Sequence, residues 1–94
     1  MSIQFHAYED LTVAATALGF TAATYGNANY ASILVESAPI RFRLDGGTPT
    51  ASVGDTLEAK DRLVLEGREE LVGFRAIRRD STSATLRANF GTIK

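Results

Sequence analysis

Apolar and polar residues alternate with a period of two along much of this 94-residue chain. Over residues 39–44, the apolar Ile40 and Phe42 alternate with the basic Arg41 and Arg43. Successive side chains of a β-strand point to opposite faces of a sheet, so this pattern predicts a strand with one buried face and one solvated face. Four further segments show the same alternation and are predicted strands: residues 3–8, 30–36, 62–66 and 83–90.

Two other apolar segments are less regular. Residues 71–78 are predicted to form a strand with Val72, Phe74 and Ala76 on one face, but Leu71 lies on the opposite face, so part of this strand would be covered on both sides. Residues 11–18 fit either a short helix or a strand. We favour the strand, because this segment is rich in β-branched residues and its neighbours are predicted strands.

Turn-forming residues separate these segments at intervals of about 8–12 residues, as in β-sandwiches and barrels. The predicted turns are Asp45-Gly46-Gly47, Gly54-Asp55, Gly67-Arg68 and Asp80-Ser81. Residues 19–29 are predicted to be a long loop or a poorly patterned strand. The sequence therefore predicts an all-β fold. We expect a single antiparallel β-sandwich over residues 1–94, with six to eight short strands in a jelly-roll or other Greek-key arrangement.

Charge is distributed unevenly, although the formal net charge is only −1. Residues 1–40 contain three acidic residues and no Lys or Arg, whereas residues 41–94 contain eight acidic residues and all ten Lys and Arg. The second part either contacts an acidic partner or has strands with a solvated, charged outer face, while the outer face of the first part carries little charge. The small net charge provides no general attraction for nucleic acid or an anionic membrane. No apolar run approaches the roughly 18–20 residues that cross a bilayer. We therefore expect neither nucleic acid nor a membrane as a partner.

Cysteine and histidine, which serve many catalytic and metal sites, are absent or nearly absent. The absence of cysteine excludes disulfides, thiolate catalysis and cysteine-ligated zinc. The single histidine, His6, cannot supply the several His ligands of a cupin-like metal site, and we expect it on the outer face of the first strand. The acidic residues near the predicted turns are interleaved with Lys and Arg, which is typical of solvated hairpins. We predict no catalytic residue, no metal site, no cofactor and no enzymatic activity.

Candidate contact residues come from two groups. Phe20, Tyr25 and Tyr30 lie in the low-charge region, where they form an interface with another molecule or close one end of the sandwich core. Arg41 and Arg43 lie on the solvated face of their strand. A basic stripe of this kind binds nucleic acid when exposed aromatic residues accompany it, but the neighbouring phenylalanines are predicted to point into the core.

A resemblance gives these features a context. An Arg-x-Arg strand at residues 41–43 is followed by Asp45-Gly46, then by Pro49-Thr50 and glycines in the next turns, and a Phe-Arg-x-Ile segment occupies residues 74–77. Over roughly residues 33–91, this order resembles a family of small phage and prophage virion proteins. The resemblance implies a β-sandwich subunit of a head, neck or tail, or a capsid decoration protein, and it carries over no catalytic residue.

The predicted function follows from this resemblance. We expect a non-enzymatic structural protein of a tailed bacteriophage or prophage, made in the host cytoplasm without Sec export and located in the virion. Its expected partners are further copies of itself, as a homo-oligomer, and other virion proteins such as the major capsid protein. The alternative is a ligand-binding β-sandwich of the carbohydrate-binding type. The absence of Trp, and the restriction of Tyr to residues 1–30, weaken this alternative.

Overall fold

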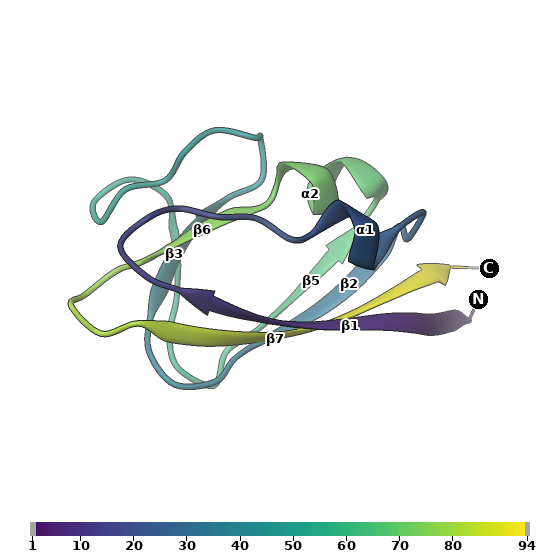
Figure 1. Cartoon of the computed structure of the whole chain (residues 1–94), viewed down its shortest axis with the longest axis horizontal. Helices are drawn as coiled ribbons and strands as arrows, with labels where there is room; N and C mark the ends of the chain where they lie inside the picture. Colours follow the sequence, from purple (N-terminus) through teal and green to yellow (C-terminus); the bar gives the residue numbers. More distant parts are fainter. Residues whose placement is uncertain (1, 94) are drawn as a thin grey trace.

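Two packed antiparallel sheets form the body of the protein in a computed structural model, which describes residues 2–93. Within these residues, seven strands form a four-stranded and a three-stranded sheet, accompanied by two short helical turns (Figure 1). The strands are β1 (Ile3–Val13), β2 (Tyr30–Val35), β3 (Ile40–Arg43), β4 (Asp55–Leu57), β5 (Arg62–Glu66), β6 (Arg75–Arg78) and β7 (Ala84–Ile93). The helical turns are α1 (Ala22–Tyr25) and α2 (Arg68–Gly73). The predicted all-β, sandwich-like architecture is confirmed at this level.

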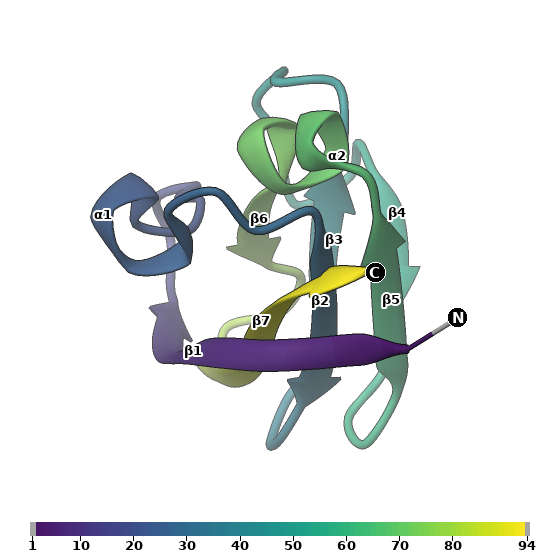
Figure 2. The ribbon, with the colours of Figure 1, turned by 90° about the vertical axis from the view of Figure 1, so that its right-hand side faces the viewer.

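The sheets combine strands that are distant in the sequence. The larger sheet has the order β1-β7-β2-β5, and the smaller sheet has the order β4-β3-β6. The long strands β1 and β7 pair from Ile3–Ile93 to Val13–Ala84, and the two chain ends lie at the same end of the molecule (Figure 1). Figure 2 shows the smaller sheet and α2 on one side of the larger sheet. Side chains on the other face of the larger sheet are exposed or half-buried, among them Phe5, Tyr8 and Val64.

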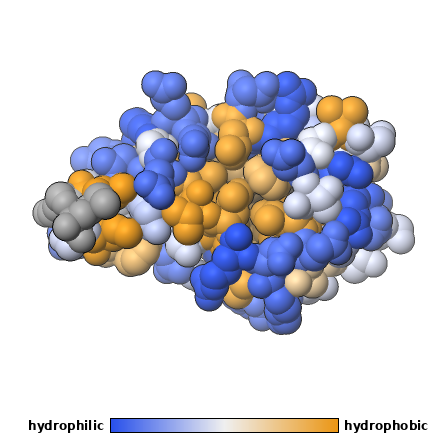
Figure 3. All heavy atoms as spheres, turned by 180° about the vertical axis from the view of Figure 1, so that it is seen from behind, coloured by the Kyte–Doolittle hydropathy of each residue, from blue (hydrophilic) through white to orange (hydrophobic). Residues whose placement is uncertain are grey.

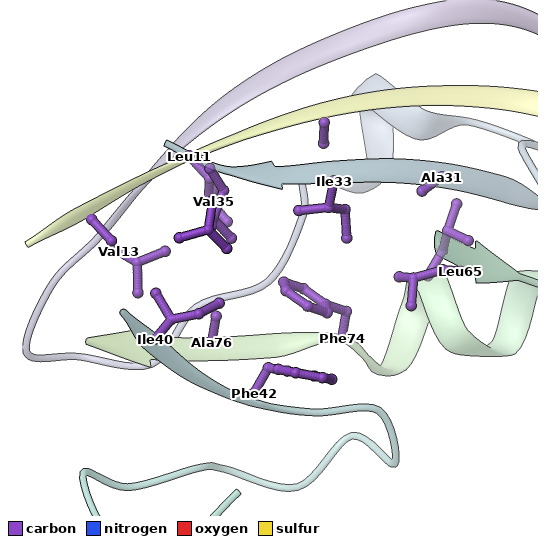
Figure 4. Packing of buried hydrophobic residues seen from close by; sticks show 14 of the residues in the cluster. Leu11, Val13, Ala31, Ile33, Val35, Ile40, Phe42, Leu65, Phe74 and Ala76 are labelled. Atoms are coloured by element: carbon purple, nitrogen blue, oxygen red, sulfur yellow. The ribbon is translucent and has the colours of Figure 1, made fainter. Parts of the chain in front are cut away.

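Much of the core consists of residues that the alternating pattern placed inward. Ile33 and Val35 of β2 point toward Ile40, Phe42 and Ala76 of the smaller sheet (Figure 4). The inward residues of β7 are also buried: Ala84, Leu86, Ala88 and Phe90. Burial of a large apolar side chain stabilises a fold by about 1.5–3 kcal/mol. The predicted facing of the strands at residues 30–36, 39–44 and 83–90 is confirmed.

Stacked aromatic rings form the centre of this core. The ring of Phe74 lies 4.7 Å from that of Phe20 and 5.9 Å from that of Phe42, both in stacked geometry. Phe90 meets Phe20 edge-on, with ring centroids 5.0 Å apart. Aromatic pairs of this kind contribute about 0.5–1.5 kcal/mol beyond the area that they bury. Four segments of the chain are thereby joined at one point.

The predicted strand over residues 71–78 is wrong in its first part. The chain forms α2 there, and β6 begins only at Arg75. Leu71 and Phe74 are both 1% exposed and stand three residues apart, which is a helical spacing, whereas Val72 is exposed. The acidic Glu69 and Glu70 lie in the first turn of α2, which favours helix. A strand would have placed Leu71 on the opposite face from Phe74, so burial of both decided the conformation.

The ambiguous segment at residues 11–18 is strand only in its first part. Leu11 and Val13 are buried at the end of β1, as the preferred interpretation expected, but residues 14–17 leave the strand. Leu18 then forms an isolated bridge with Ala76 of β6. β4 was not predicted, because only Leu57 in its three residues is apolar. Residues 19–29 contain α1 within an otherwise irregular segment.

Candidate functional site

The exposed face of the larger sheet carries a cluster of apolar and aromatic side chains, here called the aromatic face. The side chains of β7 alternate between the core and this outer face, and the strand registers place the outer residues of β1, β2 and β5 beside them. Phe5 and Tyr8 are 50% and 49% exposed. The aromatic face consists of Ile3, Phe5, Tyr8, Tyr30, Val64 and Ile93, and the polar Asn89 and Ser32 lie between Tyr8 and Val64. Large apolar residues grouped on one exposed surface indicate a contact site.

A β-bulge arranges the part of this face that β1 contributes. The register between β1 and β7 shifts between Phe5 and Ala7, so His6 is an extra residue in the strand. Odd-numbered residues before the bulge and even-numbered residues after it therefore share the outer face. This shift brings Phe5 and Tyr8 to the same side. His6 itself is exposed, and its Nε2 lies 3.3 Å from Oγ1 of Thr92.

Gly91 permits a contact across the middle strand. Phe5 and Tyr30 both lie opposite Gly91, on either side of β7. Their rings meet edge-on with centroids 5.9 Å apart. A Cβ at position 91 would lie 2.6 Å from the carbonyl oxygen of Gln4, a distance that real Cβ atoms do not adopt. The lack of a side chain at Gly91 therefore lets β1 approach β7 closely and lets Phe5 reach Tyr30 across β7.

Charged side chains border the aromatic face on one side. Tyr8 donates a hydrogen bond of 2.5 Å to Oδ1 of Asp10, and Arg87 lies 3.1 Å from the same oxygen. The guanidinium of Arg87 also lies 3.8 Å from Glu36. The hydrogen bond to Tyr8, followed by the negative charge of Asp10, raises the pKa of Arg87 above its ordinary value. These mutual contacts hold Tyr8 in place at the boundary between the apolar and charged regions.

Phe20, Tyr25 and Tyr30 were predicted to contact another molecule or to close the core. Phe20 packs against the core between Phe74 and Phe90, and Tyr25 is only 5% exposed. These positions match the second interpretation. Tyr30 is half-buried on the aromatic face and remains accessible to a partner.

Arg41 and Arg43 both bind within the chain. Arg41 donates hydrogen bonds to the carbonyl oxygens of Ala51 and Gly54, at 2.8 and 2.9 Å, and so holds the loop between β3 and β4. Arg43 forms an ion pair with Asp45 at 2.6 Å. The hydrogen bond from Arg43 lowers the pKa of the Asp45 carboxyl, and a second hydrogen bond from the amide of Gly47 adds to this effect. The two arginines therefore stabilise loop structure, and their role in an interface remains a prediction.

Two adjoining surface hollows lie between this loop and α2. Their volumes are about 520 and 750 Å³, and both are lined by Leu44, Asp45 and Glu69. Arg43 and Glu70 line the first hollow, so its charges have mixed sign. No single ligand chemistry follows from this lining.

Apolar atoms also gather on the side of the molecule seen from behind the view of Figure 1. Figure 3 shows these atoms in the middle of that side, surrounded by hydrophilic ones. The edge strands β4 and β5 lie on this side, and their residues Leu57 and Leu63 are partly buried against the core.

Residues that sequence reasoning did not select make up most of the aromatic face. Phe5 and Tyr8 belong to a predicted strand, but the alternating pattern gives no sign of the bulge that places them together. Among residues 2–93, no group of three or more His, Asp or Glu side chains is positioned to hold a metal ion. Over the same range, no helix has the length and apolar character needed to span a bilayer.

Comparison with protein-family models, with curated proteins and with solved structures finds no match for this chain. The aromatic face is therefore the structural feature on which a proposal of function rests.

Proposed function

We propose that this protein is a non-enzymatic structural subunit of a tailed-phage or prophage particle, acting through protein–protein contacts. The aromatic face is the observation that carries this proposal. A capsid decoration protein or a head or tail accessory subunit would present such a face to its own copies or to the major capsid protein. At a finer level, we propose a jelly-roll or other Greek-key topology, which is supported by the position of β7 between β1 and β2.

The chemistry of the aromatic face suits a protein partner. Phe5, Tyr8 and Tyr30 provide large contact areas with few rotatable bonds, and tyrosine hydroxyls tolerate both water and burial. The charged residues Asp10 and Arg87 lie at the margin, as charges do at the rim of many protein interfaces. A strand-built face is also rigid, so little ordering of the backbone is required when a partner binds.

The alternative is a carbohydrate-binding module, and one observation supports it. Phe5 and Tyr8 are exposed on a sheet face beside Asp10 and Arg87. Sugar rings stack on exposed aromatic rings, and adjacent charged groups can bind hydroxyls. Binding on a glycan array that is lost in Tyr8→Ala would favour this alternative over the structural role.

The structural role is tested on particles. The bacterium that carries the gene is induced, particles are purified on a density gradient, and the protein is quantified by mass spectrometry across the gradient. We expect the protein to sediment with particles at a constant ratio to the major capsid protein. Its presence only in the fractions of free protein would reject the proposal.

A further inference from the structure

The edges of the two sheets are protected unequally. The edge of the smaller sheet at β6 is covered, because Leu18 exchanges hydrogen bonds of 3.0 and 2.9 Å with Ala76, and Arg78 donates to Ala14 at 3.1 Å. The edge strand β4 has only three residues, and the edge strand β5 carries Arg62 and Glu66 at its ends. Short strands and charged residues discourage pairing with another chain.

The edge strand β1 lacks most of these protections. It has eleven residues and pairs only with β7 among the described strands. Within residues 2–93, no backbone–backbone hydrogen bond reaches its other edge. Residues 3–8 contain no Lys, Arg, Asp or Glu, and the bulge at His6 is the one feature that interrupts this edge. A long edge strand with exposed apolar side chains is a template for another strand.

Backbone hydrogen bonds identify which residues of β1 face this edge. Gly91 and Thr85 of β7 accept hydrogen bonds from Asn29 and Glu36, on the side of β2. Backbone groups of successive residues in a strand point to opposite sides, so the even-numbered residues of β7 bond to β1. The residues of β1 opposite odd-numbered β7 residues therefore turn their N–H and C=O groups to the free edge. They are Ile3, Phe5, Tyr8, Asp10 and Thr12.

We infer that β1 pairs antiparallel with β1 of a second copy of this chain, joining two four-stranded sheets into one continuous sheet. An antiparallel pair of identical strands has two-fold symmetry, so the same surface meets itself. When the pair is centred within Ile3–Tyr8, Glu9 and Asp10 of each copy lie near the beginning of the partner's strand and away from the partner's acidic residues. A parallel, in-register pair would instead place like charges side by side, which is unfavourable.

The same pairing continues the aromatic face across the dimer axis. Phe5 and Tyr8 turn their backbone groups to the free edge, and their side chains are also exposed on the outer face of β1. The two aromatic faces become one surface that is twice as wide. The inference deepens the proposed function and rests on it for a role in a particle, whereas the pairing itself can be tested on the isolated protein.

Proline scanning with light scattering is the main test. Tyr8→Pro removes an N–H group that faces the free edge, and Tyr8→Ala is the matched control that removes the ring but keeps the N–H. Thr12→Pro removes a similar N–H beyond the acidic residues. We expect the unsubstituted protein to reach twice its monomer mass of 10.1 kDa. Tyr8→Pro should raise the dimer dissociation constant about tenfold or more above that of Tyr8→Ala, and Thr12→Pro should change it little.

Amide hydrogen exchange provides a second test that requires no substitution. As the protein concentration rises, the amides of Phe5 and Tyr8 should gain protection, and the amide of Thr12 should not. A monomer at all concentrations, or a dimer with no added protection at Phe5 and Tyr8, would overturn the pairing. A monomer that still sediments with particles would overturn the pairing alone and leave the proposed function standing.

Discussion

The first thirty residues contain two pairs of aromatic side chains with opposite environments. Phe20 and Tyr25 pack into the protein's own core, whereas Phe5 and Tyr8 are exposed on the outer face of the larger sheet. Both pairs lie in the same low-charge part of the chain. The comparison shows that aromatic residues in a low-charge segment indicate contact, but not whether the contact is with the chain itself or with another molecule.

The largest expected difference in stability is between aspartate at a core aromatic position and aspartate at an exposed aromatic position. Tyr25→Asp replaces a packed ring with a charge at a position that is 5% exposed, and Tyr25 also lies under the guanidinium of Arg68 at 5.6 Å. Loss of the ring alone costs about 3–5 kcal/mol, and desolvation of the new carboxylate adds a cost that the nearby Arg68 offsets only in part. The sum is comparable with the whole stability of a small domain, about 5–15 kcal/mol. We expect Tyr25→Asp to be largely unfolded by circular dichroism.

Tyr8→Asp is the matched variant on the aromatic face. We expect it to remain folded, with weakened self-association in light scattering. A folded Tyr25→Asp protein would contradict the assignment of Tyr25 to the core.

Removal of the Phe74 ring is expected to cause the next largest loss of stability. Phe74→Ala removes a ring that stacks on both Phe20 and Phe42, and we expect the free energy of unfolding to fall by about 3–5 kcal/mol. Phe5→Ala is the control, with an expected loss of about 1 kcal/mol, because Phe5 is half-exposed and contacts only Tyr30 edge-on among aromatic rings of the described residues. Urea denaturation measures both. Equal losses in the two variants would refute the distinction between core and contact aromatics.

Gly91→Ala tests how the aromatic face is assembled. Its Cβ would approach the carbonyl oxygen of Gln4 to 2.6 Å, so β1 must move away from β7. We expect a destabilisation of about 1–3 kcal/mol, as in overpacked cores. We also expect the contact between Phe5 and Tyr30 to be lost in NMR spectra. Asn89→Ala, on the same outer face of β7, should leave both properties unchanged.

The smallest expected effect is a change in the pKa of Asp45, which lies in the loop after β3. Because Arg43 lowers the pKa of Asp45 in the folded protein, Asp45 stabilises the fold above the usual carboxyl pKa of about 3.9. This contribution is lost as the pH falls through the lowered pKa. In an NMR titration, Arg43→Ala should move the Asp45 midpoint upward toward its usual value. An unchanged Asp45 midpoint would show that the pair does not form in solution.

The local alternation of apolar and polar residues was sufficient to predict most strands and the residues that these strands turn toward the core. The period of two placed Ile33, Val35, Ile40 and Phe42 correctly, because one face of each strand must be apolar to be buried. The same rule failed at residues 71–73, where Leu71 and Phe74 reach the core together through a helical turn. It also missed β4, whose pairing with β3 depends on backbone hydrogen bonds more than on apolar residues.

The sequence by itself determined an all-β, two-layer architecture, because this follows from residue type and periodicity. The aromatic face was decided by tertiary structure. Its members come from four strands, and they meet only because β7 lies between β1 and β2 and a bulge at His6 shifts the facing of β1. Strand order and a one-residue shift of register arise from long-range backbone pairing. That pairing leaves little trace in the local pattern of apolar and polar residues.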